Sequence, residues 1–141
     1  MIAKISPSLC HGQITIPPSK SMSHRAIICA SLAKGKSRID NIAYSQDIVT
    51  TIEGMRAFGA TIITHDDFIE IDGISDVAAC EAQEIFCNES GSTLRFFIPL
   101  FSLSGKRITF RGKGRLLERP QSVYESLFHS LGLYFHHDAD G

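Results

Sequence analysis

The sequence predicts an α/β protein built from repeated β-α-β-α-β-β units. Short segments of alternating apolar and polar residues are followed by longer segments whose apolar residues recur every three or four positions. The same order then begins again, because Arg25 corresponds to Arg95 and Gly35 to Gly105, each at an offset of 70 residues. These two observations favour alternating strands and helices in two successive copies.

The repeat divides the chain into a leading segment and two units. We expect the leading segment at 1–16, the first unit at 17–75 and the second unit at 84–141, with a polar connector at 76–83. The second copy stops at Gly141, where the first copy makes its hairpin turn, so its last strand is missing. Because a missing strand leaves an unpaired sheet edge, we expect a fragment of a longer chain.

The first unit is expected to open with a strand and a helix. The segment GQITIP alternates and closes at Pro17-Pro18, which favours a strand followed by an extended turn. A helix is expected over 21–33, with Gly35 as its C-terminal stop, and SRIDNI predicts a short strand after it. The apolar stripe of this helix is predicted to consist of Met22, Ala26, Ile27, Ala30 and Ala33.

A second helix and a hairpin are expected to complete the first unit. Ser45 and the two residues after it offer a cap for a helix that ends at Gly59. Two strands, ATIITH and FIEID, follow and are hinged at Asp66-Asp67 as a hairpin. The predicted apolar stripe of the helix consists of Ile48, Ile52, Met55 and Phe58.

The second unit is expected to follow the same order. EIFC predicts a strand, a helix is expected over 91–103, and KRITFRG predicts the next strand. The last two predicted elements are a helix over 120–131 and a strand over LYFHH.

Composition and charge disfavour several classes of function. Of 141 residues 43% are hydrophobic, and 14 basic against 15 acidic side chains give a net charge of −1, which favours neither nucleic acid nor a membrane surface. No apolar run reaches the ~18 residues of a membrane span, and the start lacks an apolar leader, so we expect a cytoplasmic protein. The scattered cysteines favour reduced, mostly buried thiols, and the histidine spacing predicts no metal site.

The stretch IPPSKSMSHRAII places anion-seeking side chains at the start of the first helix. A helix N-terminus presents unpaired backbone N–H groups and a partial positive charge, which suit a phosphate or a carboxylate. Lys20 adds a point charge, Ser21 a hydroxyl at the expected cap, and Arg25 a planar fork one turn further on. Ordinary capping with solvated cations explains this stretch equally well when it is considered alone.

Two further helix starts carry the same chemistry. In NESGSTLRFF, Gly91 lets the backbone approach a ligand and Arg95 lies one turn inside the helix. In LERPQS, Pro120 suits the first helical position and holds Arg119 outside the helix at its positive end. Because helices that follow parallel strands begin at the same edge of a sheet, the three starts are expected to face one cleft.

A basic loop that contains glycines spans residues 106–119 and leads into the last predicted helix. Its six basic side chains stand against one acid, Glu118, and Phe110 is its one aromatic residue. Binding of a small phosphorylated ligand is therefore the first interpretation of this loop, and a solvated loop is the second. Nucleic-acid binding comes last, because one aromatic residue offers no platform on which bases could stack. The GxxxxGK[ST] and GxGxxG motifs are absent from the sequence, which argues against ATP or NAD.

These motifs resemble the enolpyruvyl transferase family, and within it the branch that acts in the shikimate pathway. The matching pieces are PPSKSMSHRAII, SGSTLR and LLERPQSVYESL, and the resemblance spans essentially the whole chain. Lys20-Ser21 and His24-Arg25 favour the shikimate branch over the related UDP-N-acetylglucosamine transferases. The resemblance implies part of the N-terminal domain of an inside-out α/β barrel, with the leading segment starting in the other domain.

The resemblance also implies a reaction and a site. Enzymes of this branch transfer the enolpyruvyl group of phosphoenolpyruvate to the 5-hydroxyl of shikimate 3-phosphate and release phosphate, without a metal or an organic cofactor, on the route to chorismate and aromatic amino acids. The resemblance assigns shikimate 3-phosphate to Lys20, Ser21 and Arg25, and phosphoenolpyruvate to Lys20, Gly91 and Arg119. Candidates for supporting roles are Arg95, Glu89 and Asp47.

Two positions depart from the family's pattern, and part of the family's site lies outside this sequence. Glu89 stands where asparagine is usual and would need a cation partner such as Arg95 or Lys20, and Phe96 stands where proline commonly follows the arginine. The proton-transferring acids of the family lie beyond Gly141. We therefore expect no catalytic residue in this fragment, no activity without the remainder of the enzyme, and a monomer when the enzyme is complete. The alternative is a non-catalytic module that binds phosphorylated metabolites.

Overall fold

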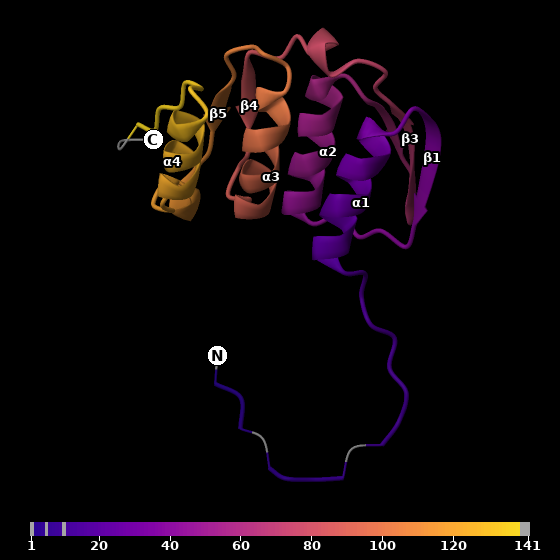
Figure 1. Cartoon of the computed structure of the whole chain (residues 1–141). Helices are drawn as coiled ribbons and strands as arrows, with labels where there is room; N and C mark the ends of the chain where they lie inside the picture. The colour runs from indigo at the N-terminus through magenta and orange to yellow at the C-terminus, as the bar shows by residue number, and fades with distance from the viewer. Residues whose placement is uncertain (1, 5, 10, 139–141) are drawn as a thin grey trace.

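The helices of the protein stand side by side, as the computed structural model in Figure 1 shows. The structure describes residues 2–4, 6–9 and 11–138. Its helices are α1 (Lys20–Leu32), α2 (Gln46–Phe58), α3 (Gly91–Ser102) and α4 (Ser122–Ser130). Its strands are β1 (Gly35–Asp40), β2 (Thr61–Thr64), β3 (Phe68–Gly73), β4 (Glu84–Phe86) and β5 (Thr109–Arg111). Two short 3-10 turns cover Val77–Ala79 and Gly114–Leu116.

The first sheet is antiparallel and has the strand order β1-β3-β2. Ile39 lies opposite Ile69 in the β1–β3 pair, and Ile62 lies opposite Ile71 in the β2–β3 pair. The predicted hairpin at Asp66-Asp67 is confirmed, because β2 and β3 pair on either side of it. One face of this sheet packs against α1 and α2, so its inward isoleucines join the core.

The second sheet is the parallel pair β4–β5, in which Ile85 lies opposite Phe110. Parallel strands have their carboxyl ends at the same edge. The two segments that lead from these strands into α3 and α4 therefore run beside each other, and the N–H of Cys87 donates to the carbonyl of Arg111 at 2.7 Å. This edge brings the start of α3 next to the basic loop.

The core contains one stripe that the sequence predicted and one that it did not. The α2 stripe is confirmed, because Ile48, Ile52, Met55 and Phe58 are each at most 2% exposed. The α1 stripe is wrong at its ends, since Met22 is 63% exposed and Ala33 is exposed as well. The polar residues Ser23, His24 and Ser31 are buried on α1 instead. Apolar periodicity misplaced this face because α1 packs against α2 through polar side chains.

Two predicted strands do not form among the described residues. Residues 12–17, the GQITIP segment, leave the body as an extended arm in Figure 1, and the side chains of Ile14 and Ile16 are 83% and 73% exposed. Residues 133–137, the LYFHH segment, are also irregular. The reason is the same in both places: a strand is stable only beside another strand, and no described segment pairs with either.

The elements around the basic loop are shorter than predicted. Only Thr109–Arg111 of the KRITFRG segment is a strand, and α4 begins at Ser122 rather than at Pro120. Gln121 occupies the cap position, but its side chain does not cap the N–H groups of the described first turn. Pro120 thus ends the loop and does not open the helix.

The described thiols differ in exposure. Cys80 and Cys87 are buried and Cys29 is exposed, while Cys10 lies outside the described residues. Burial raises the pKa of the Cys87 thiol to about 12, so this side chain is a core residue and not a nucleophile. None of the helices in the described part of the chain is long and apolar enough to cross a bilayer.

Candidate anion-binding site

Three of the helices begin with the same serine cap. The Oγ atoms of Ser19, Ser45 and Ser90 accept from the backbone N–H groups of Met22, Ile48 and Thr93 at 3.4, 3.4 and 3.3 Å. Each cap satisfies one N–H of its first turn and leaves others directed outward. In Figure 1 these starts all lie on the lower side of the body. Their dipoles therefore place partial positive charge on one side of the molecule.

Ser21 is not the cap of α1, contrary to the sequence-based expectation. The cap is Ser19, whose backbone is extended and whose carbonyl accepts from the N–H of Ser23 at 2.9 Å. The helix starts earlier than predicted because the two prolines stiffen the chain only as far as Pro18. Ser21 consequently lies in the exposed first turn, where its hydroxyl does not have to cap the helix.

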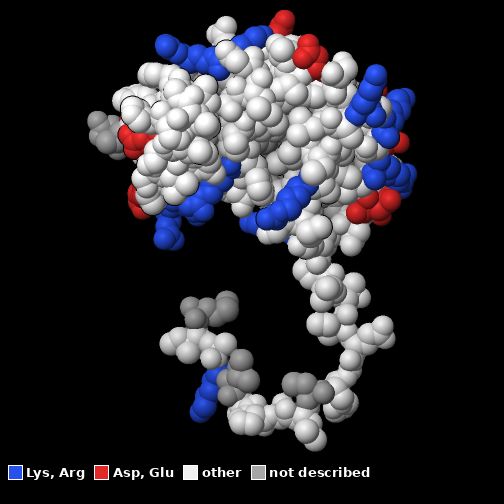
Figure 2. Space-filling view, viewed as in Figure 1, with Lys and Arg blue, Asp and Glu red and all other residues white. Residues whose placement is uncertain are grey.

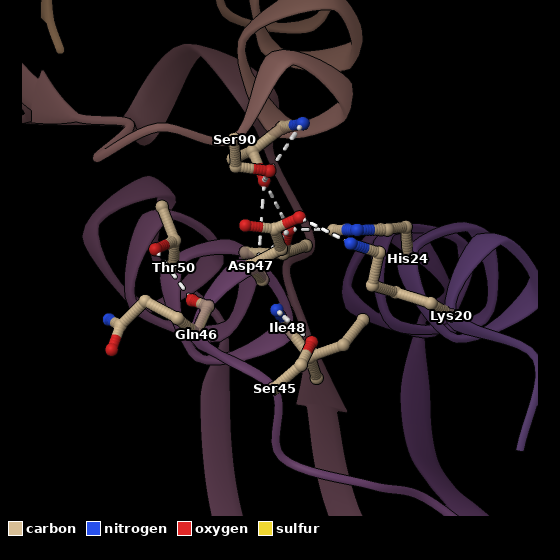
Figure 3. Close-up of polar contacts among 10 residues, drawn as sticks. Lys20, His24, Ser45, Gln46, Asp47, Ile48, Thr50 and Ser90 are labelled. Carbon is tan, nitrogen blue, oxygen red and sulfur yellow. Dashed lines mark hydrogen bonds and ion pairs between the residues drawn. The ribbon is translucent and has the colours of Figure 1, made fainter. Parts of the chain in front are cut away.

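Lys20 and Asp47 join the starts of α1 and α2. The Nζ atom of Lys20 lies 2.6 Å from Oδ2 of Asp47, and their side chains are 54% and 29% exposed. Figure 3 shows the two side chains reaching toward each other from neighbouring helices. The exposed pair leaves the ammonium open to a ligand on its solvent side. Asp47, which was predicted to have only a supporting role, therefore contacts Lys20 directly, a residue predicted to bind both substrates.

Arg25 lies between two supports one turn into α1. Its Nη1 atom donates to the carbonyl of Ser21 at 2.8 Å, and its guanidinium lies 5.2 Å from the ring centre of Phe96 on α3. A cation at this distance from an aromatic face is attracted by the ring quadrupole. Phe96, which departs from the family's pattern, thus contacts Arg25, a residue predicted to bind shikimate 3-phosphate.

Gly91 and Arg119 are brought together at the start of α3. A Cβ atom on Gly91 would lie 2.2 Å from Nη1 of Arg119 and 3.1 Å from its Cζ. The guanidinium therefore lies directly against the backbone of the first residue of α3. The carbonyl of Arg119 accepts from Nε2 of Gln121 at 3.1 Å, which fixes the backbone from which this side chain extends. Arg119 precedes α4 in sequence, but its guanidinium lies at the start of α3.

Glu89 lies against the basic loop and not against Lys20 or Arg95. A Cβ atom on Gly114 would lie 2.8 Å from the Glu89 carboxyl group, and Gly114 has a φ of +55°, a conformation that favours glycine. The neighbouring N–H of Lys113 donates to the carbonyl of Asn88 at 2.9 Å. Among the described residues Glu89 forms no ion pair. Its carboxylate is therefore one side of the contact between this loop and the start of α3.

Arg95 lies in the first half of α3 with an exposed side chain. Its backbone carbonyl accepts from the Tyr124 hydroxyl at 2.9 Å, which ties α4 to α3. Figure 2 shows Lys and Arg side chains along the lower rim of the body, beneath the ends at which the helices begin. This basic rim and the helix starts lie on the same side of the body.

Four buried side chains that the sequence analysis did not assign connect the same helix starts. Nδ1 of His24 lies 2.7 Å from Oγ1 of Thr51, which lies 2.8 Å from Oγ1 of Thr93, which in turn lies 2.7 Å from Oγ of Ser90. Burial lowers the pKa of His24; Lys20 and Arg25 act in the same direction and Asp47 opposes them.

The spacing of buried polar residues on α1 could have revealed this network. His24, Ile27 and Ser31 are three and four residues apart and so share a helix face, but two of the three are polar and were not counted as core. No group of three or more His, Cys, Asp or Glu side chains that could hold a metal ion occurs in the described part of the chain.

Comparison with known proteins places this geometry in a family context. Residues 6–134 match the family model described as EPSP synthase (3-phosphoshikimate 1-carboxyvinyltransferase). The 3-phosphoshikimate 1-carboxyvinyltransferase of Clostridium perfringens (strain 13 / Type A) is 44% identical over 136 residues, which cover 96% of this chain and 32% of that protein. The protein of the same name from Clostridioides difficile (strain 630) is 46% identical, over 89% of this chain and 31% of its own length.

Solved structures agree in fold. An EPSP synthase structure from Acinetobacter baumannii superposes with a TM-score of 0.73 at 21% identity, over 87% of this chain and 28% of that one. A second EPSP synthase structure from that organism gives a TM-score of 0.72 at 22% identity. The chain spans about a third of the length of the curated relatives it matches.

Proposed function

This chain belongs to the EPSP synthase family, and on that basis we propose that it carries part of the substrate site of a 3-phosphoshikimate 1-carboxyvinyltransferase. The reaction transfers the enolpyruvyl group of phosphoenolpyruvate to the 5-hydroxyl of shikimate 3-phosphate and releases phosphate. The observation that carries the proposal is the contact between the Arg119 guanidinium and the backbone of Gly91. It combines a helix N-terminus, a residue without a side chain and a planar cation, which together suit a small anion.

In this proposal each of the two substrates binds at a different helix start. Shikimate 3-phosphate binds at the start of α1, where Ser21 and Arg25 are exposed and one turn apart. Phosphoenolpyruvate binds at the start of α3, between Gly91 and Arg119. Lys20 serves both substrates.

Asp47, Arg95 and Glu89 have supporting roles. Asp47 holds the Lys20 ammonium at 2.6 Å and orients it before an anion arrives. Arg95 adds positive charge near the α3 start, and Glu89 holds the basic loop near that start through its contact with Gly114.

The chemical task of these residues is to bring two anions together. Opposed phosphate and carboxylate groups repel each other, and fixed cations reduce that repulsion while holding the reacting atoms close. The addition of the 5-hydroxyl and the later loss of phosphate also need groups that donate and accept protons within hydrogen-bond reach. We assign no such group to this chain. It binds and orients substrates, and turnover requires the rest of an EPSP synthase polypeptide.

The cellular setting follows from the same proposal. The complete enzyme is a cytoplasmic monomer of aromatic amino acid biosynthesis that needs neither a metal nor an organic cofactor. A non-catalytic module that binds phosphorylated metabolites is the second candidate, because we assign no proton-transferring group to this chain.

Ligand titration separates these two functions. We expect shikimate 3-phosphate to shift amide signals at the start of α1 and to bind at least tenfold more tightly than glucose 6-phosphate. Lys20→Ala should weaken binding about tenfold, the effect of losing one charge-assisted contact. Lys34→Ala is the matched control, because Lys34 is an exposed lysine at the opposite end of α1.

Three results would contradict the proposal. Equal affinity for both phosphates would favour the module. Equal losses of affinity in Lys20→Ala and Lys34→Ala would show that the binding site is not at Lys20. Phosphate release by this chain from the two substrates, abolished by Lys20→Ala, would show that it is a complete catalyst.

A further inference from the structure

A chain of buried polar side chains runs beneath the anion-binding helix starts and crosses three helices. It contains His24 from α1, Thr51 from α2, and Thr93 and Ser90 from the start of α3, and we call these four residues the buried relay. Each of the four is at most 1% exposed. Polar groups this deep are costly unless they are hydrogen-bonded, and here each is bonded to the next at 2.7 or 2.8 Å.

The carbonyl oxygen of Asp47 lies at the centre of the buried relay. It is 3.2 Å from Oγ1 of Thr51 and 3.5 Å from Oγ1 of Thr93. A carbonyl oxygen can only accept, so the Thr51 hydroxyl has to donate its one proton to it if the 3.2 Å contact is a hydrogen bond. Figure 3 shows Asp47 between His24 and Ser90, in the middle of this arrangement.

This direction determines the proton on His24 and is consistent with one arrangement of the others. Since Thr51 has given its proton to Asp47, Nδ1 of His24 must carry the proton that joins it to Thr51. The Thr93 hydroxyl can then donate to Thr51, and the Ser90 hydroxyl to Thr93, while Ser90 accepts from the N–H of Thr93 at 3.3 Å. In this arrangement every hydroxyl donates one hydrogen bond, and no contact has a proton on both of its atoms pointing at each other. In the opposite tautomer the Thr51 oxygen would face the Asp47 carbonyl without a proton between them.

The other ring nitrogen, Nε2 of His24, is buried and has no hydrogen-bond partner among the described residues. A positive imidazole would place a second N–H there without an acceptor. Lys20 and Arg25 on α1 would repel that charge, and Asp47 on α2 would attract it. The Thr51 hydroxyl beside Nδ1 and the α3 hydroxyls beyond it are uncharged. Desolvation is the largest of these effects and lowers the pKa of His24, which favours the neutral imidazole.

We propose that His24 is a positioning residue that, as the neutral Nδ1–H tautomer, locks α1 to Thr51 of α2 and to the cap of α3. This inference rests on the proposed function for its consequence. The locked parts carry Lys20, Asp47 and Gly91, so the buried relay sets the distance between the two anion-binding starts. Protonation of His24 at acidic pH breaks this register and weakens binding of a phosphorylated ligand, although His24 itself does not touch it.

Two substitutions of His24 test the tautomer and the positioning role together. In His24→Asn the amide N–H occupies the place of Nδ1–H and does not titrate, whereas His24→Leu removes the donor and keeps comparable bulk. We expect His24→Asn to bind shikimate 3-phosphate within about twofold of the wild type and His24→Leu to bind about tenfold more weakly, the size of one lost buried hydrogen bond.

The pH profile is the readout that a merely structural role would not move. As the pH falls below 6.5, the affinity of the wild type should fall more steeply than that of His24→Asn. The phosphate of the ligand also titrates in this range, near pH 6, but equally for both proteins. Only the difference between the two profiles belongs to His24. Coincident profiles would overturn the proposal.

Two measurements need no ligand and keep the inference separate from the proposed function. Long-range ¹H–¹⁵N correlation spectra of the labelled 141-residue chain report the His24 tautomer, and a proton on Nε2 at neutral pH would overturn the assignment. Amide hydrogen exchange at Thr93 reports the α3 cap, and we expect it to accelerate in His24→Leu but not in His24→Asn. If no variant or wild type binds shikimate 3-phosphate, the proposed function fails, and these two measurements still decide whether the buried relay positions α3.

Discussion

Replacing Gly91 with alanine tests whether Arg119 reaches the start of α3 because no side chain stands there. The new Cβ would lie 2.2 Å from Nη1 of Arg119, whereas ordinary contact begins at 3.4 Å, so the guanidinium must withdraw by about 1.2 Å. Arg119 is exposed and can move. Alanine is also the better helix former, so the free energy of unfolding should change by less than about 0.5 kcal/mol.

The expected loss is in binding. A guanidinium moved by more than 1 Å gives up a charge-assisted contact, which contributes roughly 1.5–3 kcal/mol, so the affinity for phosphoenolpyruvate should fall about 10- to 100-fold. The assay is a titration followed by amide shifts at the start of α3, with thermal unfolding measured in parallel.

A double substitution decides whether the two residues act together. If the alanine acts by displacing Arg119, then Gly91→Ala combined with Arg119→Ala should bind no worse than Arg119→Ala alone. Fully additive losses, or unchanged affinity in Gly91→Ala, would refute the reasoning from this contact. A large fall in thermal stability would also refute it, because the displaced side chain would then be part of the core.

Three further outcomes follow from single contacts. Because the pKa of His24 is lowered from its ordinary value of 6.5, the unfolded chain binds the proton first, and the free energy of unfolding in urea should fall as the pH drops below 6.5, but not in His24→Asn. Phe96→Leu removes the aromatic face beneath Arg25 and should weaken shikimate 3-phosphate binding about two- to fivefold in a titration, with unchanged melting. Gly54→Ala places a Cβ 2.0 Å from the buried ring of Phe97 and should destabilise the chain by about 1–3 kcal/mol in urea unfolding, and a neutral result would show that α2 and α3 can separate freely.

Elements with a strong local signal were predictable from the sequence. The α2 helix combines a serine cap, a regular apolar stripe and a terminal Gly59 with a φ of +122°, and each of these depends on near neighbours in the chain. The hairpin at Asp66-Asp67 is equally local. Side-chain patterns of this kind identify an element without knowledge of what packs against it.

Elements that depend on distant partners were not predictable in the same way. GQITIP alternates like a strand, but alternation supplies no pairing partner, and the segment is irregular and exposed. The α1 face was misjudged because a buried histidine is stabilised by a threonine on another helix, 27 residues away. The spacing of His24, Ile27 and Ser31 puts them on one helix face, but a pattern of apolar residues counts only the isoleucine.

The amino-acid sequence by itself determined the α/β class, the cations near the helix starts and the resemblance to a family, because these depend on local patterns and motifs. Only the tertiary structure decided which of those groups meet. It placed Arg119 against Gly91, Arg25 over Phe96 and Lys20 beside Asp47, and it joined three helix starts through the buried relay. These contacts depend on how α1, α2 and α3 pack, which is a property of the whole core and not of any one segment.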